Sequence, residues 1–421
     1  MHKIKENSWI YYMGLFFIFP FLSLFIALRN PNDKFSYNII WFFTFFFGLT
    51  FAINYDATND MVRYLQEFNL WKGEGRGMGY LIENSYGVER TSYKDIFFPF
   101  ISFVSSKLEL TDVLFLGILG FIFGYFYSRI YKNLMENITF YKPSLFLIIL
   151  ICTYMLVIPM WRGINGIRFS LAAIIFIYTL LKDYNKSLSL TSLLIISSLI
   201  LIHFSMLFPI ILFLLFHFFH KLLPIKVLFL IFLISFFITT VSLNELNFLI
   251  QDILPEFLHS KSDTYLRDSY LIEIAERSAD TNLYALIFLK SLFYATSIMI
   301  FFIFFHYRKL IRYNPRLSYI IKFSFLFAAI INILSFIPSF NRMGLISNTI
   351  VLYIFMVAIS NISVQKRYFS ISKIILTPML LLYVIVQMRI GFDHMSIETV
   401  IGNPFVALFD LDNTPLIDLI K

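Results

Sequence analysis

The chain has 421 residues, of which 59% are hydrophobic and only 14% are charged. A soluble globular chain carries about 25% charged residues, so this composition excludes an ordinary soluble domain and indicates an integral membrane protein. The net charge of +8 does not indicate nucleic-acid binding, because the lysines and arginines fall mostly in short connections, as the positive-inside bias of membrane proteins predicts.

Apolar stretches long enough to cross a hydrocarbon core of about 30 Å recur along the whole chain. They predict an all-α polytopic membrane protein that forms a single domain over 1–421, with about 12 transmembrane helices including a retained first span. The expected spans are 9–28, 37–54, 112–131, 144–160, 164–181, 188–203, 204–219, 225–241, 283–306, 318–337, 344–361 and 371–388. Segment 96–108 is apolar but short and carries Pro99 near its start, which favours a re-entrant or interfacial helix.

The charges of the connections predict the orientation of these spans. Five connections are basic and nearly free of acid, and their regular alternation along the chain predicts that all five are cytoplasmic. Parity then places two long carboxylate-rich loops, 55–95 and 242–282, on the external side. The short turns that carry Arg162–Arg168, His203 and Arg342 fall on the same side. The position of the amino terminus, which holds Lys3 and Lys5, stays open.

The first external loop contains an amphipathic segment that starts near Thr58. As a helix it gathers an apolar stripe on one side, made of Met61, Tyr64, Leu65, Phe68 and Trp71. Its other side carries Asn59, Arg63, Gln66 and Glu67, with Asp60 at the boundary. Such a helix is expected to lie along the membrane surface with its aromatic stripe in the headgroups.

Ionisable groups inside apolar segments are costly, so they mark candidate functional residues. Arg168 lies in such a segment and Arg162 precedes it, with Gly163 and Gly166 allowing close backbone approach. Two arginines at an external helix start fit a pyrophosphate, because the guanidinium fork and the helix dipole both favour phosphate. The alternative is that Arg162 anchors the helix at the interface while Arg168 extends outward.

Three further residues have both a functional and a structural interpretation. His203 stands between two apolar runs and can position or deprotonate a hydroxyl, or simply bond a neighbouring carbonyl. Arg342 is a lone cation in a short external turn, where it can bind an anion or anchor the next span. Asp60 is either a site carboxylate or an acid that favours a helix N-terminus.

The sequence lacks the motifs of several common classes of enzyme and metal site. The chain contains no HExxH, no Walker motif and no Cys/His metal cluster, and Cys152 is its only cysteine. No cofactor or metal is therefore expected. Arginines, a histidine and external carboxylates remain, and this set suits group transfer from an anionic lipid carrier whose phosphate leaves.

Four pieces of the sequence, in this order, resemble the EpsG family of polysaccharide polymerases, which belongs among the Wzy-type O-antigen and capsule polymerases. The similarity to this family is patchy and extends from about residue 9 to residue 390. The pieces are TNDMVRY (Thr58–Tyr64), IRFSLAAIIF (Ile167–Phe176), HFSMLF (His203–Phe208) and FNRMGLI (Phe340–Ile346). The chain departs from the family where Thr-Asn-Asp replaces a common Gly-Thr-Asp and where YKDIFFPF replaces a Glu-Pro-Gly stretch.

The resemblance implies a reaction at the outer face of the bacterial cytoplasmic membrane. A growing glycan on undecaprenyl diphosphate would be transferred en bloc to a hydroxyl of a new lipid-linked repeat unit. A flippase and a chain-length regulator of the same pathway are the implied partners.

The resemblance also assigns roles to residues of this chain. Arg168 and Arg342 would hold the donor diphosphate and offset its charge as it leaves. His203 or Asp60 would accept the proton of the attacking hydroxyl. Arg63 and Tyr64 would contact sugar or headgroup.

Other classes of membrane protein stay as alternatives. A lipid-linked glycan flippase would be expected to show an internal repeat and charges that line a central cavity. A polytopic glycosyltransferase that adds one sugar from a polyprenyl-phosphate donor would use acids of the first external loop, such as Asp56 and Asp60. A membrane acyltransferase lacks its usual early His and Arg pair here, and a purely structural protein would not explain Arg168 and Arg342.

Overall fold

The computed structural model describes residues 8–31, 33, 35–53, 60–85, 93, 95–138, 144–183, 189–238, 283–335, 337, 340, 342–361, 366–409 and 414–420. In this part of the chain every named element is a helix, and the strand-like pairings are isolated bridges such as that between Phe51 and Met395. The predicted all-α class is therefore confirmed for these residues. The whole of the expected external loop 242–282 lies outside them, as do residues 54–59, 86–92 and 94 of the first loop.

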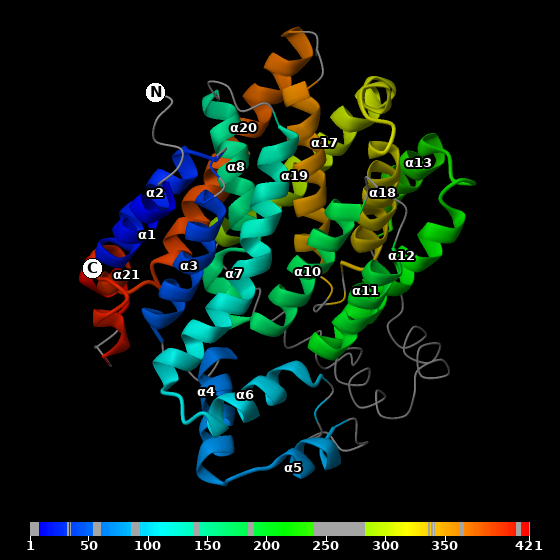
Figure 1. Ribbon diagram of the computed structural model, residues 1–421. Helices are drawn as coiled ribbons and strands as arrows, with labels where there is room; N and C mark the ends of the chain where they lie inside the picture. Colours follow the sequence, from blue (N-terminus) through cyan, green and yellow to red (C-terminus); the bar gives the residue numbers. More distant parts are fainter. Residues whose placement is uncertain are drawn as a thin grey trace.

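Each expected span contains a helix or a pair of helices (Figure 1). The first part of the chain forms α1 (Ser8–Ile18), α2 (Pro20–Arg29), α3 (Ser36–Leu49), α4 (Asp60–Gly73), α5 (Met78–Glu83), α6 (Phe97–Lys107), α7 (Asp112–Asn137), α8 (Leu145–Val157), α9 (Met160–Asn165) and α10 (Ile167–Asp183). The second part forms α11 (Leu190–Ile202), η1 (Phe204–Met206), α12 (Leu207–Phe219), α13 (Ile225–Ser235), α17 (Leu283–Tyr313), α18 (Leu317–Ile333), α19 (Met343–Asn361), α20 (Lys366–Gly391), α21 (Ile397–Ile401), η4 (Val406–Leu408) and α22 (Leu416–Ile420).

Length and composition identify this fold as a multi-pass membrane protein. Among the described residues, five helical segments are long and apolar enough to cross a membrane. They are 112–137, 145–165, 290–313, 343–361 and 370–391. Seven further apolar helices have only 10 to 17 residues. The first two of these helices are short because the first expected span is divided at Pro20. This proline lies at the start of α2, a position where proline is tolerated.

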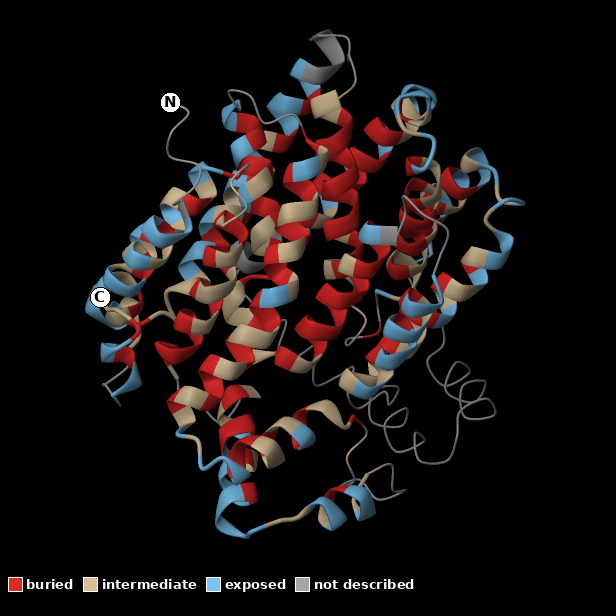
Figure 2. Ribbon diagram, in the orientation of Figure 1, coloured by how far each residue is buried: buried red, intermediate tan, exposed pale blue. Residues whose placement is uncertain are grey.

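The bundle has a buried centre and an apolar outer surface. Figure 2 shows the buried residues gathered along α7, α10 and α19, while α1, α11 and α13 expose much of their length. The exposed faces carry large apolar side chains such as Phe25, Leu194 and Leu230, each more than half exposed. Apolar outer faces of this kind fit contact with lipid, where every backbone polar group is satisfied inside the helix.

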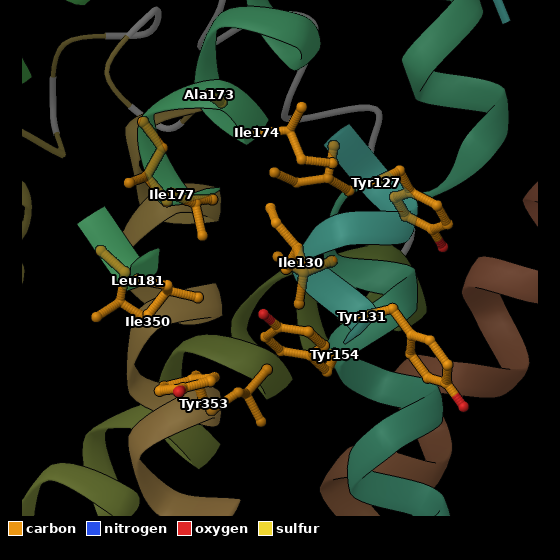
Figure 3. Packing of buried hydrophobic residues seen from close by; sticks show 14 of the residues in the cluster. Tyr127, Ile130, Tyr131, Tyr154, Ala173, Ile174, Ile177, Leu181, Ile350 and Tyr353 are labelled. Atoms are coloured by element: carbon orange, nitrogen blue, oxygen red, sulfur yellow. The ribbon is translucent and has the colours of Figure 1, made fainter. Parts of the chain in front are cut away.

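Aromatic and branched side chains fill the centre of the bundle. Figure 3 shows Ile130 of α7 and Tyr154 of α8 on the side of Ile177 of α10 and Tyr353 of α19, while the ring of Tyr127 of α7 points away from them. The hydroxyl of Tyr127 donates to the carbonyl of Met155 at 2.9 Å. Close packing of this kind makes the centre a rigid support for the helix ends.

The tightest helix pair joins α3 and α7, where glycines replace larger side chains. A Cβ atom at Gly120 or Gly124 would overlap Thr44, and one at Gly48 would overlap the backbone carbonyl of Leu116. Small residues let transmembrane helices approach closely, which increases van der Waals packing in lipid. Trp41 adds a hydrogen bond from its indole to the carbonyl of Phe121 at 2.8 Å.

The connections alternate between two ends of the bundle, as the loop charges predict. The α12–α13 and α17–α18 connections lie at the upper end in Figure 1, and they contain the basic residues Lys221 and Arg316. The opposite, lower end carries α4, α5 and α6. It also carries the short stretch between α8 and α10. Which end faces the cytoplasm stays a prediction from the charges.

The amphipathic segment of the first loop forms α4, and its five buried residues are the five of the predicted stripe. The stripe does not face lipid headgroups, so that part of the expectation is wrong. Phe68 stacks on Phe115 of α7 at 4.3 Å, and Tyr64 packs on Phe98 of α6 at 4.3 Å. Helix α6, from the segment expected not to span, lies outside the bundle across its lower end (Figure 1). It covers the stripe that we expected lipid to cover.

Candidate functional site

The candidate site lies at the lower end of the bundle, around the short helix α9 and the start of α10. A Cβ atom at Gly163 would overlap the ring of Phe123, so glycine is needed for α9 to lie against α7. Asn165 ends α9, and its side-chain oxygen accepts the backbone N–H of Met61 at 3.0 Å. This bond connects the start of α4 to the turn between the two arginines. The start of α4 is thereby held against the turn between α9 and α10.

Helices α4 and α6 together form a cap over the lower end of the bundle (Figure 1). Arg168 is the centre of a polar cluster between the bundle and this cap. Its Nη1 donates to both carboxylate oxygens of Asp95, at 3.0 and 3.3 Å, and its Nε donates to the hydroxyl of Tyr64 at 3.1 Å. The Asp95 side chain is 10% exposed and that of Arg168 is 36% exposed. Burial of both partners strengthens their attraction and makes the loss of either one costly. Arg168 is thus a paired cation held in one direction.

Asp95 was not predicted as a site residue. It lies just before α6, and its neighbour Ile96 donates a backbone hydrogen bond to the carbonyl of Leu201 near the end of α11. This bond connects the acid to a second helix of the bundle. The available signal was an acid that immediately precedes an apolar segment, in the stretch YKDIFFPF. Its partner lies 73 residues away, and sequence spacing gives no measure of that pairing.

Glu67 is a second carboxyl group that sequence reasoning placed only on the polar side of the helix. It faces the same cluster from α4, beside Trp71, Tyr93 and Arg168. Its Oε1 atom and Nε1 of Trp71 are shielded from solvent and have no partner at normal hydrogen-bond distance among the described residues, while the side chains of Trp71 and Tyr93 still favour the charged form of the carboxyl group as weak hydrogen-bond donors. Burial raises the pKa of Glu67 and the charge of Asp95 adds to that effect, while Arg168 opposes it. Burial, together with the charge of Glu67, also raises the pKa of Tyr93 to about 12.

His203 lies close to the same cluster, at the end of α11. Its ring contacts that of Phe169, the neighbour of Arg168, with centroids 5.6 Å apart. Its Nδ1 accepts the backbone N–H of Ser205 at 3.2 Å and lies 2.7 Å from the Ser205 hydroxyl. A neutral imidazole whose Nδ1 accepts a hydrogen bond carries its proton on Nε2. His203 is therefore arranged as a hydrogen-bond donor through Nε2.

Asp60 and Arg63 form an ion pair with each other on the first turn of α4, and Arg63 is 64% exposed. Their charges are matched at the surface of the cap. Tyr64 follows them but is only 6% exposed, since it packs on Phe98 and accepts the bond from Arg168. Tyr64 therefore positions Arg168 in this structure. Burial raises its pKa and keeps the phenol protonated.

Arg162 and Arg342 form a separate cationic pair. Their guanidinium groups lie near enough for the two positive charges to repel each other. Arg162 lies over the ring of Trp161 at 5.2 Å and near Tyr383 of α20. Arg342 is exposed just before α19. Among the described residues neither arginine forms an ion pair with a carboxylate.

The structure thus brings the predicted residues together in two groups at one end of the bundle. Arg168, Tyr64 and His203 join the unpredicted Asp95 and Glu67, while Arg162 and Arg342 form the cationic pair. Asp60 and Arg63 lie at the edge of the first group. Nowhere in the described ranges do three or more His, Cys, Asp or Glu side chains gather as a metal site would require.

Comparison of the chain with protein-family models, with curated proteins and with solved structures finds no match.

Proposed function

We propose that this protein is a polysaccharide repeat-unit polymerase of the bacterial cytoplasmic membrane, with about 12 spans and its site at the outer face. It transfers a growing glycan from undecaprenyl diphosphate to a hydroxyl of a new lipid-linked repeat unit. The observation that carries the proposal is the pair of like-charged arginines, Arg162 and Arg342, without a carboxylate partner among the described residues. They lie at the same end of the bundle as a cluster of carboxyl groups.

The positive charges of Arg162 and Arg342 repel each other and have no carboxylate partner among the described residues, and an anion bound by both would offset that repulsion. A diphosphate suits this position, because it carries several charges and its oxygens match the planar guanidinium fork. Trp161 adds an indole N–H that is shielded from solvent and has no hydrogen-bond partner, so it can donate to a phosphate oxygen. We therefore assign the donor diphosphate to Arg162 and Arg342.

Arg168 takes a different place in this proposal from the one that the family resemblance implies. Its charge is already matched by Asp95 and its direction is fixed by Tyr64, so it is less suited than Arg162 to a second anion. It organises the carboxyl groups at the acceptor side. His203, a donor through Nε2, is placed to hydrogen-bond a sugar oxygen.

The arginines act most strongly as the glycan leaves its carrier. The acceptor hydroxyl attacks the anomeric carbon of the donor sugar, and the bond from that carbon to the diphosphate oxygen breaks. Negative charge develops on that oxygen, where preformed cations stabilise the transition state more than the ground state. A flippase that delivers lipid-linked units and a chain-length regulator are the partners expected in the same membrane.

The test compares Arg162→Ala and Arg342→Ala with a matched control, Arg389→Ala. Arg389 lies in the last turn of α20 and is paired with Asp393 at 2.8 Å, so its loss removes an arginine whose charge is already matched. With equal protein levels in cells that lack the native gene, the first two variants are expected to leave glycans of single repeat units. The control is expected to restore the full ladder. A full ladder in both site variants would contradict the assignment.

One observation favours a second candidate function. Asp95 and Glu67 both belong to the first external loop, where a glycosyltransferase that uses a polyprenyl-monophosphate sugar carries its acids. Such an enzyme adds one sugar in each reaction, whereas a polymerase adds a whole repeat unit. The mass of the first product, made from defined lipid-linked substrates, separates the two functions.

A further inference from the structure

The carboxyl group of Glu67 has an unusual place in the cluster around Arg168. It lies on α4 beside Trp71 and Tyr93, and the positive charge of Arg168 acts on it from α10. Its Oε1 is shielded and has no partner at normal hydrogen-bond distance among the described residues. A buried polar atom without a partner is rare in proteins and calls for an explanation. An incoming hydroxyl would supply the missing hydrogen bond.

The other groups that could accept a proton here are already engaged. Both oxygens of Asp95 accept hydrogen bonds from Arg168. Asp60 is bound to Arg63 at the exposed edge of the cap. Nδ1 of His203 accepts the backbone N–H of Ser205. Among the carboxyl groups of this cluster that the structure describes, Glu67 is left as the one with a shielded oxygen that has no close hydrogen-bond partner.

We infer that Glu67 is the catalytic base of the transfer and takes the proton of the attacking acceptor hydroxyl. This inference rests on the proposed function. In the step, the O–H bond of the acceptor breaks and its proton goes to the Glu67 carboxylate. The freed oxygen bonds to the anomeric carbon, and the electron pair of the breaking carbon–oxygen bond leaves with undecaprenyl diphosphate. Glu67 returns its proton to water before the next turnover.

The surroundings of Glu67 make its carboxylate a stronger base than an exposed one. Among the described residues, the titratable or charged groups that act on it are Arg168 of α10, Asp95 before α6 and Tyr93. Burial has the largest effect and raises its pKa, Asp95 adds to it, and Arg168 limits it. A carboxylate of raised pKa is a stronger base than an exposed one, and the positive charge of Arg168 favours its ionised form.

The experiment measures transfer by the purified full-length protein with synthetic undecaprenyl-diphosphate-linked repeat units in detergent, between pH 5 and pH 9. The variants are Glu67→Gln and Glu67→Asp, and the control is Glu83→Gln, an exposed carboxyl at the end of α5. The wild-type rate should rise as pH increases through the ionisation of Glu67. Glu67→Gln should lower kcat by about 100-fold or more, lose that rise and keep the KM for the donor. The control should match the wild type.

Each outcome decides the proposal. A Glu67→Gln variant that keeps its rate within about twofold and its pH profile overturns the role of Glu67 while the polymerase proposal stands. If Glu67→Gln does not fold, as judged by its elution and melting, Glu67→Asp replaces it. The shorter carboxylate of Glu67→Asp should then lower kcat while the rate still rises with pH, and an unchanged kcat overturns the role of Glu67 as the base. No transfer by the wild type, with any lipid-linked glycan, overturns the proposed function and this inference with it.

Discussion

The exchange Asp95→Asn tests the physical basis of the cluster, because it keeps the shape of the side chain and removes its charge. Arg168 Nη1 lies 3.0 Å from the nearer Asp95 oxygen. With an effective dielectric constant of about 20, the attraction at this distance is about 5.5 kcal/mol. Desolvation of the two groups and the 36% exposure of the Arg168 side chain reduce the net value. We expect a coupling of about 1–3 kcal/mol.

A double-mutant cycle measures this coupling. Asp95→Asn, Arg168→Met and the double variant are unfolded in mixed detergent, and the fluorescence of the four tryptophans reports the free energy of unfolding. The double variant should lose less stability than the sum of the single variants, by the coupling energy. The pair Arg389–Asp393, whose side chains are 48% and 37% exposed, serves as the control and should show less than about 1 kcal/mol. Additive losses within about 0.3 kcal/mol for Asp95 and Arg168 would refute the reasoning.

Three further predictions concern the fold. Gly120→Ala should prevent accumulation of folded protein, because its Cβ would overlap a backbone carbonyl of α3, whereas Gly14→Ala, with open space around it, should elute normally from a sizing column; normal elution of both would contradict the packing. Phe68→Ala should lower the free energy of unfolding by about 3–5 kcal/mol and make α4 more sensitive to limited proteolysis. Leu70→Ala, at a side chain that is 44% exposed, should not do so, and equal cleavage of the two variants would argue against the buried stripe. Burial lowers the pKa of His394 from 6.5 to about 4. As the pH falls, the unfolded state therefore binds the proton first, and the free energy of unfolding should decrease by about 3 kcal/mol between pH 6.5 and pH 4. His394→Phe should abolish that loss, and a loss equal to that of the wild type would refute its origin.

The sequence was most informative where one helix determines the answer. The apolar stripe of α4 follows from helical periodicity alone, and all five of its residues are buried. What covers the stripe does not follow from periodicity, and α6 proved to be the cover where lipid was expected. Hydropathy likewise located the helices, although Pro20 divides the first expected span and many helices are shorter than a full crossing.

The site was harder to predict because its contacts join distant parts of the chain. Arg168 stood out as an expensive charge, but its partner Asp95 lies 73 residues away, and no spacing rule connects the two. Glu67 looked like an ordinary polar residue of α4, since a helical wheel shows which side a residue takes and not what lies opposite. The interaction of Arg162 with Arg342 joins α9 to the residue just before α19, far along the chain. Such contacts come from packing, which a single sequence does not contain.

The central claim is that Arg162 and Arg342 hold a lipid diphosphate while a whole repeat unit is transferred. The most direct measurement is the product ladder formed by the purified protein from one undecaprenyl-diphosphate-linked repeat unit, without nucleotide sugars. The account predicts products that increase by whole repeat units in the wild type and disappear in Arg162→Ala and Arg342→Ala. Products that grow by a single sugar, or a ladder unchanged in both variants, would contradict it.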